Sequence, residues 1–234
     1  MLTKSSEPKT RMGLGPGLQQ SAKRHQYNIC MSSTVDADQK LEVLPATGEH
    51  WPAVAEFFAN HPCTCQYWRL SASDYGRRGQ EDIAQWQAER QAALRRQMEA
   101  APPPGMLAYL DGELVGWCGF GPRPQMERLV RSRTIPKVDE QPVWAVVCFI
   151  VNVGYRRLGI ADALLTGTVD YARQQGAPGL EAYPVDPEGE RINTSAAYVG
   201  TTSRFARAGF ERVLMSDSTS AGLPRWLVRL EFDR

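Results

Sequence analysis

The sequence has almost no excess charge of either sign. Among its 234 residues, 27 Lys and Arg balance 26 Asp and Glu, which leaves a formal net charge of +1. A chain this neutral has no overall field that would draw it to nucleic acid or to an anionic membrane. Any basic chemistry must therefore be local, and neither nucleic acid nor a membrane is an expected partner.

The sequence also has no long apolar run. No segment approaches the ~20 apolar residues that a membrane-spanning helix needs. Residues 1–40 are basic and rich in Ser, Gly and Pro, and they contain no apolar core of a signal peptide. We expect them to be a disordered extension, in preference to an organelle address, and residues 41–234 to form a single domain. Met31 opens a plausible native start, so whether residues 1–30 belong to the native chain stays open.

Cysteine is scarce, and its number is odd. Five cysteines without a secretory signal indicate reduced thiols and a cytoplasmic protein rather than a disulfide framework. Four sulfurs could hold zinc, but the Cys-x2–4-Cys pairs typical of structural zinc sites are missing. No metal is therefore expected, and Cys118 and Cys148 are predicted to be buried neutral thiols. The five residues are Cys30, Cys63, Cys65, Cys118 and Cys148.

Apolar periodicity predicts one mixed sheet with helices on its faces. Strand-like and helical runs follow one another in the order β-α-α-β-β-β-α-β-α-β-β. Asp111-Gly112 is a strong signal for a tight hairpin turn between two of the strands. The predicted strands are 41–46, 106–110, 113–122, 143–152, 179–185, 211–217 and 225–232, and the predicted helices are 50–62, 81–100, 160–175 and 201–209, with a further short one at 125–133.

Two of these elements carry more detailed expectations. The helix 81–100 is predicted to turn Ile83, Trp86, Leu94 and Met98 toward the core. The last strand, 225–232, could be an edge strand and so pair between subunits, which makes a homodimer a candidate assembly.

The stretch GYRRLGIADALL, residues 154–165, is the most unusual local pattern. A strand that feeds a glycine turn into a helix presents free backbone N–H groups and the positive end of the helix dipole. Gly159 and Ala161 leave the main chain open to close approach, and Arg156 and Arg157 can add charge-assisted hydrogen bonds. The pattern is neither a Walker loop nor a GxGxxG fingerprint. It favours a phosphate-bearing ligand of another kind, although a purely structural turn has the same pattern.

In its context this stretch resembles the signature of the GNAT superfamily of acyl-CoA-dependent N-acyltransferases. That signature is Gln/Arg-x-x-Gly-x-Gly/Ala, and a Gly-Phe corner follows it later in the chain. The resemblance implies an α/β fold with a central mixed, mostly antiparallel sheet of about seven strands. About four helices would flank the sheet, which would be splayed between its fourth and fifth strands. The matching residues are Arg156, Gly159, Ala161, Gly209 and Phe210.

The resemblance also implies how acetyl-CoA would be held as a co-substrate. The pantetheine arm would pair with the main chain at Phe149, Ile150 and Val151, as an added strand does, and an amide near Val151 would steady the oxyanion. Phe205 would pack beside the cofactor. The implied activity is N-acetyl transfer directly to an amine, of a small molecule in preference to a protein. The coenzyme pyrophosphate would be bound by Arg156, Arg157, Leu158, Gly159, Ile160 and Ala161.

The sequence departs from the family at the general acid. Many members have a tyrosine four residues before the glycine of the Gly-Phe corner, and here that position is Phe205. A phenyl ring has no proton to donate, so the role is vacant or has moved. Tyr198, Ser203 and Tyr183 lie in the right region, and Tyr198 is favoured among them, although a thiolate can also leave without an acid.

The sequence does not decide which group is the general base either. Members that modify lysine often use a glutamate on the central strand, but 143–152 contains no carboxylate. Glu181, on the neighbouring strand, is the best acidic candidate, and Asp186 and Glu188 come next. If Glu181 is not the base, it is expected to be a solvated strand residue. A water chain to bulk solvent is an equal alternative, since an amine of modest pKa needs little assistance.

Aromatic residues before and within the second helix are the candidates for acceptor choice. A wall of rings suits a small molecule with apolar or cationic parts, although at least half of them are expected to pack in the core. Cys63 and Cys65 would border the same pocket, and a route through an acyl-Cys148 is less favoured than direct transfer. Two other functions stay open, namely transfer from a longer acyl-CoA or a carrier-protein thioester, and a non-catalytic acyl-CoA sensor. The aromatic candidates are Tyr67, Trp68, Tyr75 and Trp86.

Overall fold

The parts of the chain that the computed structural model describes are residues 39–61, 63–76, 82–187, 189 and 197–232. Most of the expected N-terminal extension, including Cys30, lies outside the described residues, and so does the candidate base Glu188. Among the described helices, none is both long enough and apolar enough to cross a membrane.

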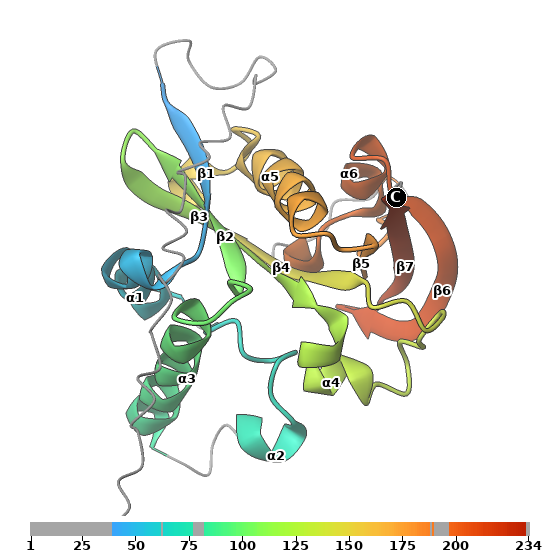
Figure 1. Cartoon of the computed structure of the whole chain (residues 1–234), viewed down its shortest axis with the longest axis horizontal. Helices are drawn as coiled ribbons and strands as arrows, with labels where there is room; N and C mark the ends of the chain where they lie inside the picture. Colours follow the sequence, from blue (N-terminus) through green and yellow to red (C-terminus); the bar gives the residue numbers. More distant parts are fainter. Residues whose placement is uncertain (1–38, 62, 77–81, 188, 190–196, 233–234) are drawn as a thin grey trace, which may run out of the picture.

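A seven-stranded sheet forms the centre of the molecule (Figure 1). Its strands lie in the order β1-β2-β3-β4-β5-β7-β6, and every neighbouring pair is antiparallel except β4 and β5. The predicted mixed, mostly antiparallel sheet is therefore confirmed. The strands are β1 (Leu41–Pro45), β2 (Gly105–Leu110), β3 (Glu113–Pro122), β4 (Trp144–Val151), β5 (Gly179–Ala182), β6 (Glu211–Ser220) and β7 (Leu223–Glu231).

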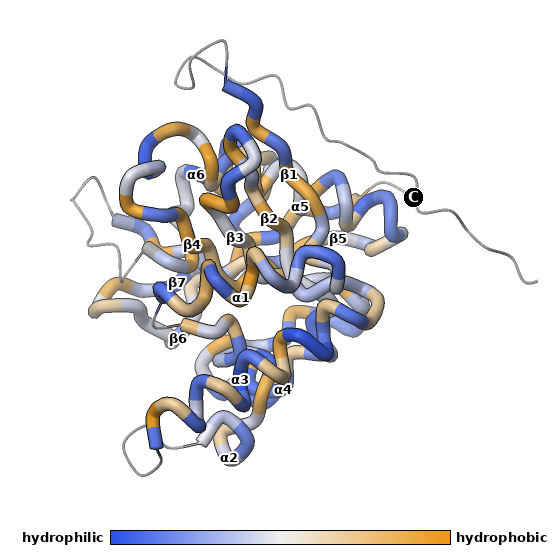
Figure 2. The backbone as a smooth tube through the Cα atoms, turned by 90° about the vertical axis from the view of Figure 1, so that its left-hand side faces the viewer, coloured by the Kyte–Doolittle hydropathy of each residue, from blue (hydrophilic) through white to orange (hydrophobic). Residues whose placement is uncertain are grey.

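Helices cover both faces of this sheet and divide the core into two clusters. α5 and α6 pack on one face, where Leu164 and Phe205 are fully buried, and α1 and α3 cover the other through Phe58 and Leu94. Figure 2 shows that α3 is largely hydrophilic, as expected of a helix that buries one narrow stripe. The helices are α1 (Trp51–Ala59), α2 (Ala72–Tyr75), α3 (Ile83–Met98), α4 (Glu127–Val130), α5 (Ile160–Gln174) and α6 (Thr202–Arg207).

The hairpin between β2 and β3 forms at the predicted place. Asp111 and Gly112 both have left-handed backbone angles, with φ of 50° and 85°. A two-residue turn of this kind matches the twist of the strands that it joins. It sets the register in which Leu110 pairs with Glu113.

β4 separates from β5 part-way along its length. The two strands pair in parallel only as far as Val146 and Ala182, whereas β4 stays paired with β3 as far as Val151. From Val147 onward, one edge of β4 therefore has no strand partner among the described residues. This is the expected splay between the fourth and fifth strands.

A β-bulge in β4 accounts for the separation. Gly119 and Phe120 are consecutive on β3, but their partners on β4 are Cys148 and Val146, so Val147 is an extra residue. A bulge bends its strand and increases the local twist, which turns the end of β4 away from β5. It also places Val147 and Cys148 on the same face of the sheet, the one that carries α1 and α3.

The packing of α3 differs from the prediction at its first residue. Ile83 is 58% exposed, because the stripe that faces the core begins one turn later, at Trp86, and continues through Leu94 and Met98. Arg90 is buried in the middle of this stripe. Its guanidinium lies over the Trp86 ring at 5.1 Å and donates to the carbonyl oxygen of Asp74 at 2.7 Å. A charged residue thus holds a core position that the hydrophobic pattern could not indicate.

The last strand is not an edge strand, so that prediction is wrong. β7 lies between β5 and β6, and β6 forms this edge of the sheet. The reason is that the chain passes from α6 into β6 before it returns as β7, beside the short inner strand β5. A homodimer that pairs through β7 has no free strand edge to use.

Candidate active site

The turn that leads into α5 presents main-chain N–H groups. Gly159 is the N-cap of the helix and has left-handed backbone angles, with φ of 77°, which a residue with a side chain adopts only under strain. The N-cap glycine has no side chain to cap this helix, and the amides of Ile160 and Ala161, at its first positions, have no intrahelical acceptor. Leu158 and Ile160 pack against the core and fix the turn. An anion would find here both N–H donors and the positive end of the helix dipole.

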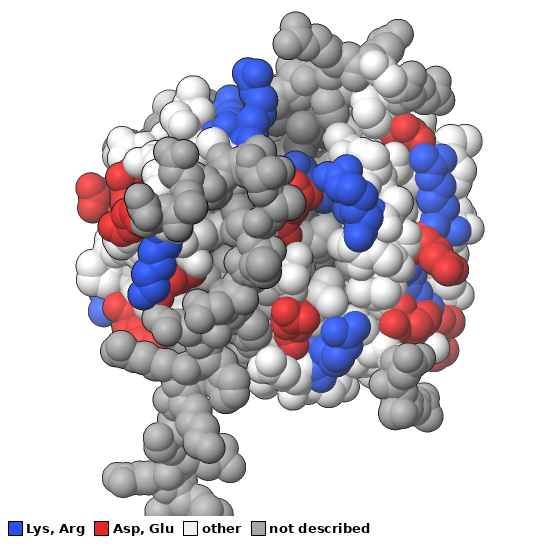
Figure 3. All heavy atoms as spheres, turned by 90° about the horizontal axis from the view of Figure 1, so that it is seen from above, with Lys and Arg blue, Asp and Glu red and all other residues white. Residues whose placement is uncertain are grey.

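Arginine side chains surround this helix start. Arg156 and Arg157 are exposed in the turn, and α6 contributes Arg204 and Arg207. Asp162, in the first turn of α5, accepts hydrogen bonds from Arg204 Nε at 2.9 Å and from Arg207 Nη2 at 3.2 Å. These four arginines and Asp162 together carry a net positive charge, which fits a diphosphate. Figure 3 shows that basic and acidic side chains are interspersed among the described residues of the face seen from above.

The end of β4 offers a free main-chain edge next to this turn. Phe149 points to the α5 face and packs against Phe205, with ring centroids 6.1 Å apart, whereas Ile150 points to the opposite face. Since β5 has already separated, main-chain groups along this edge, up to Val151, are available to an extended ligand. A Cβ on Gly200 would come within 2.8 Å of the Phe205 ring. Phe205 is therefore a tightly packed residue beside the splay.

Tyr198 lies next to β4 and is polarised by an arginine. It belongs to η4 (Ala197–Val199), a 3-10 turn that packs against β4. Its hydroxyl oxygen accepts a hydrogen bond from Arg225 Nη2 at 2.6 Å, and that bond does not use the hydroxyl proton. Burial raises the pKa of Tyr198, while the charge and hydrogen bond of Arg225 oppose the rise. The side chain therefore keeps a proton that it can donate at neutral and moderately alkaline pH.

Glu181 is held in a buried ion-pair network. Its carboxylate accepts hydrogen bonds from Arg229 Nη2 at 2.7 Å and from the Tyr183 hydroxyl at 3.0 Å, and it lies 3.4 Å from Arg123 Nε. The expectation of a solvated strand residue is wrong, because β5 is an inner strand and Glu181 is only 1% exposed. Two arginine side chains thus pair with this carboxylate, as a buried charge requires.

The other candidates also have structural partners. Burial and the Glu181 charge raise the pKa of Tyr183, whose hydroxyl already donates to that carboxylate. Asp186 forms an ion pair with Arg212. Ser203 is exposed at the start of α6, with its Oγ 3.1 Å from Thr201 Oγ1. Neither acidic candidate that the structure describes is thus an unpaired carboxylate.

Three thiols gather beside the β4 bulge. Cys63 and Cys65 come from the loop before α2, and the Cys148 thiol is hydrogen-bonded to both. The hydrogen bond with Cys148 lowers the pKa of Cys63 to about 7, against the effect of burial and with help from the Cys65 amide at 3.3 Å. The same hydrogen bonds, together with burial, raise the pKa of Cys148 well above its usual range. Cys148 is therefore the protonated partner and Cys63 the more acidic one.

Cys118 takes no part in this cluster. Its side chain faces α5, whereas Cys148 faces α1 and α3, so the two do not share a site although their strands are neighbours. Burial raises the pKa of Cys118 to about 12, and both residues are buried free thiols as predicted. In the described part of the chain, no group of three or more His, Cys, Asp or Glu is placed to hold a metal ion.

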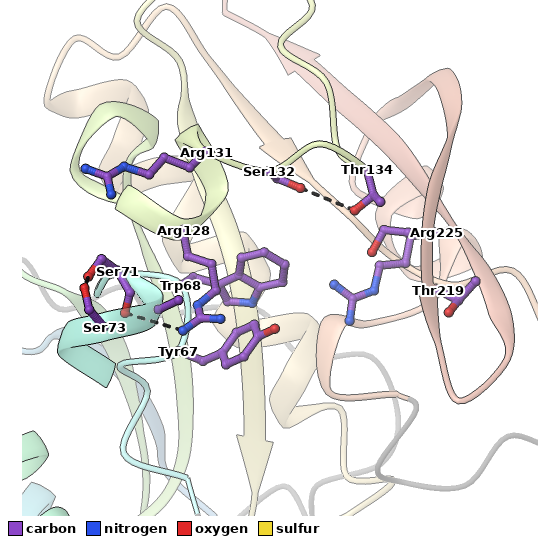
Figure 4. A pocket seen from close by; sticks show the side chains of 12 residues that line it. Tyr67, Trp68, Ser71, Ser73, Arg128, Arg131, Ser132, Thr134, Thr219 and Arg225 are labelled. Atoms are coloured by element: carbon purple, nitrogen blue, oxygen red, sulfur yellow. Dashed lines mark hydrogen bonds between the residues drawn. The ribbon is translucent and has the colours of Figure 1, made fainter. Parts of the chain in front are cut away.

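A pocket of about 400 Å³ opens between the loop before α2, the region of α4 and the hairpin of β6 and β7 (Figure 4). Two of the four aromatic candidates, Tyr67 and Trp68, line it. Tyr75 and Trp86 lie outside, where their rings pack against each other with centroids 5.3 Å apart. Trp68 and Trp86 are buried and Tyr75 is half-buried, so half of the four rings pack in the core, as expected.

No pattern in the sequence indicated the arginines of this pocket. Arg128 and Arg225 both line it, but they are far apart in the sequence and match no motif. One signal was present, since Arg225 opens the predicted strand 225–232, whose other residues are mostly apolar. Its partner Tyr198 was found, yet nothing in the spacing indicated that the two would meet.

A comparison with models of protein families assigns the chain to one family. The model of the acetyltransferase (GNAT) family matches residues 66–191, more than half of the chain. This segment includes β4, the turn before α5, and β5. A comparison with curated proteins gave no significant match.

Three solved structures with a similar fold are distant from this chain in sequence. The polyamine N-acetyltransferase of Drosophila melanogaster, which forms N-acetylagmatine, is 13% identical, with a TM-score of 0.52 over 82% of this chain and all of that one (100%). A structure described only as an acetyltransferase is 16% identical, with a TM-score of 0.52 over 82% of this chain and 99% of that one. A histone acetyltransferase and related acetyltransferase from Corynebacterium glutamicum is 19% identical, with a TM-score of 0.48 over 80% of this chain and 93% of that one. At these identities the likeness concerns the fold alone.

Proposed function

Because the chain belongs to the GNAT family of acetyltransferases, we propose that it transfers the acetyl group of acetyl-CoA directly to an amine of a small molecule. The observation that carries this proposal is the free edge of β4 beyond Val146, which the turn at residues 152–159 connects to the N-terminus of α5. An extended arm and a diphosphate, joined as they are in coenzyme A, fit these two features in sequence.

Each part of this site has a proposed binding role. The main chain of Phe149, Ile150 and Val151 pairs with the pantetheine arm, as an added strand would. The amides from Leu158 to Ala161 bind the diphosphate at the helix start, and Arg156 and Arg157 add charge. Phe205 packs against Phe149 and takes no part in proton transfer.

The proposed reaction is a single displacement. The lone pair of the acceptor amine attacks the thioester carbonyl carbon, the C–N bond forms and the C–S bond breaks. A main-chain amide at the free edge of β4 stabilises the charge that develops on the carbonyl oxygen. The amine proton passes to water, because Glu181 and Asp186 are already paired with arginines.

Tyr198 is the proposed general acid for the departing thiolate. It packs on β4 beside the splay, its pKa is raised, and the Arg225 hydrogen bond leaves its proton free to be donated. Phe205 occupies the usual tyrosine position, so the hydroxyl is supplied seven residues earlier in the chain. A route through an acyl-Cys148 is disfavoured, because the raised pKa keeps this thiol protonated and a thiol is a weak nucleophile.

The test is coenzyme A release from acetyl-CoA in the presence of a panel of small amines. We expect release above the buffer rate with at least one amine, and recovery of the N-acetyl product by mass spectrometry. Longer acyl-CoAs run in parallel would reveal a different donor. Tight binding of acetyl-CoA with no turnover on any amine would contradict the proposal and favour a sensor.

We also propose that residues 41–234 act as one catalytic domain and that the protein works in a reducing compartment such as the cytoplasm. The second statement is supported by the four described cysteines, all of which are free thiols.

A further inference from the structure

The pocket beside Tyr198 contains an arginine for which the described part of the chain supplies no counter-ion. Arg225 is only 5% exposed, and its guanidinium lies 5.4 Å from the Trp68 ring centre and 5.5 Å from that of Tyr198. Nη2 donates to Tyr198, but Nε and Nη1 have no hydrogen-bond partner among the described residues. Figure 4 shows the guanidinium pointing into the pocket from β7. Buried N–H donors without a partner are costly, so this group is prepared for an acceptor that enters the pocket.

A second arginine faces the same space. The Arg128 guanidinium lies over the Tyr67 ring, 4.3 Å from its centre, and its Nε has no partner among the described residues. Its Nη2 donates a long hydrogen bond to the Ser71 carbonyl oxygen, at 3.4 Å. Arg131 differs, since it is exposed, pairs with Glu127 at 2.6 Å and points away from the other two (Figure 4). Stacking on a ring holds the Arg128 fork in one plane, the geometry that a carboxylate or phosphate needs.

The rest of the lining suits an oxyanion as well. Six serine and threonine side chains surround the two arginines, and none of the described residues of the lining is acidic. Hydroxyls can donate to an anionic oxygen without adding charge. A volume of about 400 Å³ lies in the range of small-molecule sites.

We infer that the acceptor is an amine that also carries an anionic group, a carboxylate or a phosphate-type group, and that Arg225 and Arg128 bind this group. The inference rests on the proposed acetyl transfer, and it names the class of acceptor. Tyr198 connects the two sites, because it packs on β4 and accepts the hydrogen bond of Arg225. An anion held by Arg225 would therefore place the rest of the acceptor beside the end of β4. A polycationic acceptor would be repelled by the same arginines.

The first experiment compares acceptors that differ only in the anionic group. Ethanolamine is paired with phosphoethanolamine, and propylamine with β-alanine, which separates phosphate from carboxylate recognition. We expect kcat/KM to be at least about tenfold higher for the anionic member of one pair, since hydrogen bonds to a charged group contribute on that scale. In Arg225→Met and Arg128→Gln this preference should fall toward one. Arg96→Gln, an exposed arginine of α3, removes the same charge elsewhere and should keep the preference.

The second experiment measures the anion site without catalysis. Inorganic phosphate, and acetate in a parallel series, is titrated by calorimetry into the protein saturated with coenzyme A, so that the coenzyme site is already filled. We expect saturable binding of one of the two anions, which is lost in Arg128→Gln. If Arg225→Met does not fold, Arg128→Gln still provides the test, because Arg128 is only partly buried.

The outcomes separate this inference from the proposed function. Acetylation of amines with no preference for the anionic member, together with no anion binding, would overturn the anionic-acceptor inference and leave acetyl transfer intact. Saturable anion binding that needs Arg128, with no acetylation of any amine, would support the pocket and contradict the proposed activity. If the preference for anionic acceptors and the binding of the anion are both lost in the two arginine variants, the anionic-acceptor inference and the proposed acetyl transfer are both supported.

Discussion

Arg225 Nη2 lies 2.6 Å from the hydroxyl oxygen of Tyr198, and this contact connects the proposed coenzyme site with the proposed acceptor pocket. Tyr198 packs on β4, where the sheet opens, and Arg225 forms one wall of the neighbouring pocket. A change in either residue should therefore affect both acceptor binding and the chemical step.

Tyr198→Phe should lower kcat by about 100-fold, the usual contribution of a general acid, with a smaller effect on the KM of acetyl-CoA. Since burial raises the pKa of Tyr198, the side chain stays protonated from pH 6 to 9. The ratio of wild-type to variant kcat should then be constant over this interval in a steady-state pH profile.

Tyr109→Phe is the matched control, because it removes a half-exposed hydroxyl from β2, away from the splay. It should leave kcat unchanged. A Tyr198→Phe enzyme with full activity would remove Tyr198 from the mechanism, and a ratio that rises with pH would instead indicate a tyrosinate acting as base.

Cys63 should be the most reactive thiol of the described part of the chain. Its pKa of about 7 means that its thiolate, the reactive form, accumulates as the pH rises through 7. Alkylation by iodoacetamide, followed by peptide mass spectrometry, should show a midpoint near pH 7 for Cys63 and little modification of Cys118, whose pKa is about 12.

Cys148→Ala tests the cause of this shift. Removal of the hydrogen bond that stabilises the Cys63 thiolate should move the midpoint upward, toward the ordinary value of 9.0. An unchanged midpoint would show that Cys148 does not set the acidity of Cys63.

Glu181→Gln should affect stability more than catalysis. The carboxylate is 1% exposed and Arg229 is 7% exposed, and removal of one member of a buried ion pair costs about 3 kcal/mol or more. Urea unfolding should show this loss, while kcat of the folded variant stays close to that of the wild type. Glu140→Gln, which changes an exposed partner of Lys137, should change stability by less than about 0.5 kcal/mol. Unchanged stability with a large loss of kcat would identify Glu181 as the base.

Gly159→Ala should weaken coenzyme A binding by about tenfold, or about 1.4 kcal/mol, because a Cβ would stand where the diphosphate approaches the amides. The left-handed angle adds a stability cost of about 1 kcal/mol. Gly176→Ala is a control with nearly the same backbone strain, since φ is 72° there and 77° at Gly159, and nothing lies within 4 Å of its added Cβ. It should lose similar stability and keep its affinity in calorimetric titrations. Equal affinity in both variants would move the diphosphate away from α5.

The sequence predicted the fold well because the signals were local. The unbroken apolar run of β4 and the hairpin at Asp111-Gly112 each depend on a few consecutive residues. The errors concerned contacts between distant segments. The position of β7 depends on which neighbours its two edges find, and the burial of Glu181 depends on arginines from β7 and from the turn after β3.

The same distinction between local signals and contacts of distant segments applies to the site. The turn from Arg156 to Ala161 was found because its spacing is itself the signal. The arginine pocket was not found, because Arg128 and Arg225 meet only when the region of α4 and the last hairpin fold beside the loop that carries Tyr67. The bulge at Val147 was also invisible, since an apolar run looks the same with or without an extra residue.

The most direct test of the whole proposal is a crystal structure of the protein with acetyl-CoA. We expect electron density for the pantetheine arm along β4 from Val147 to Val151, and density for the diphosphate against the amides from Leu158 to Ala161. Clear density for the coenzyme at any other place on the molecule would contradict both the site and the reaction proposed from it.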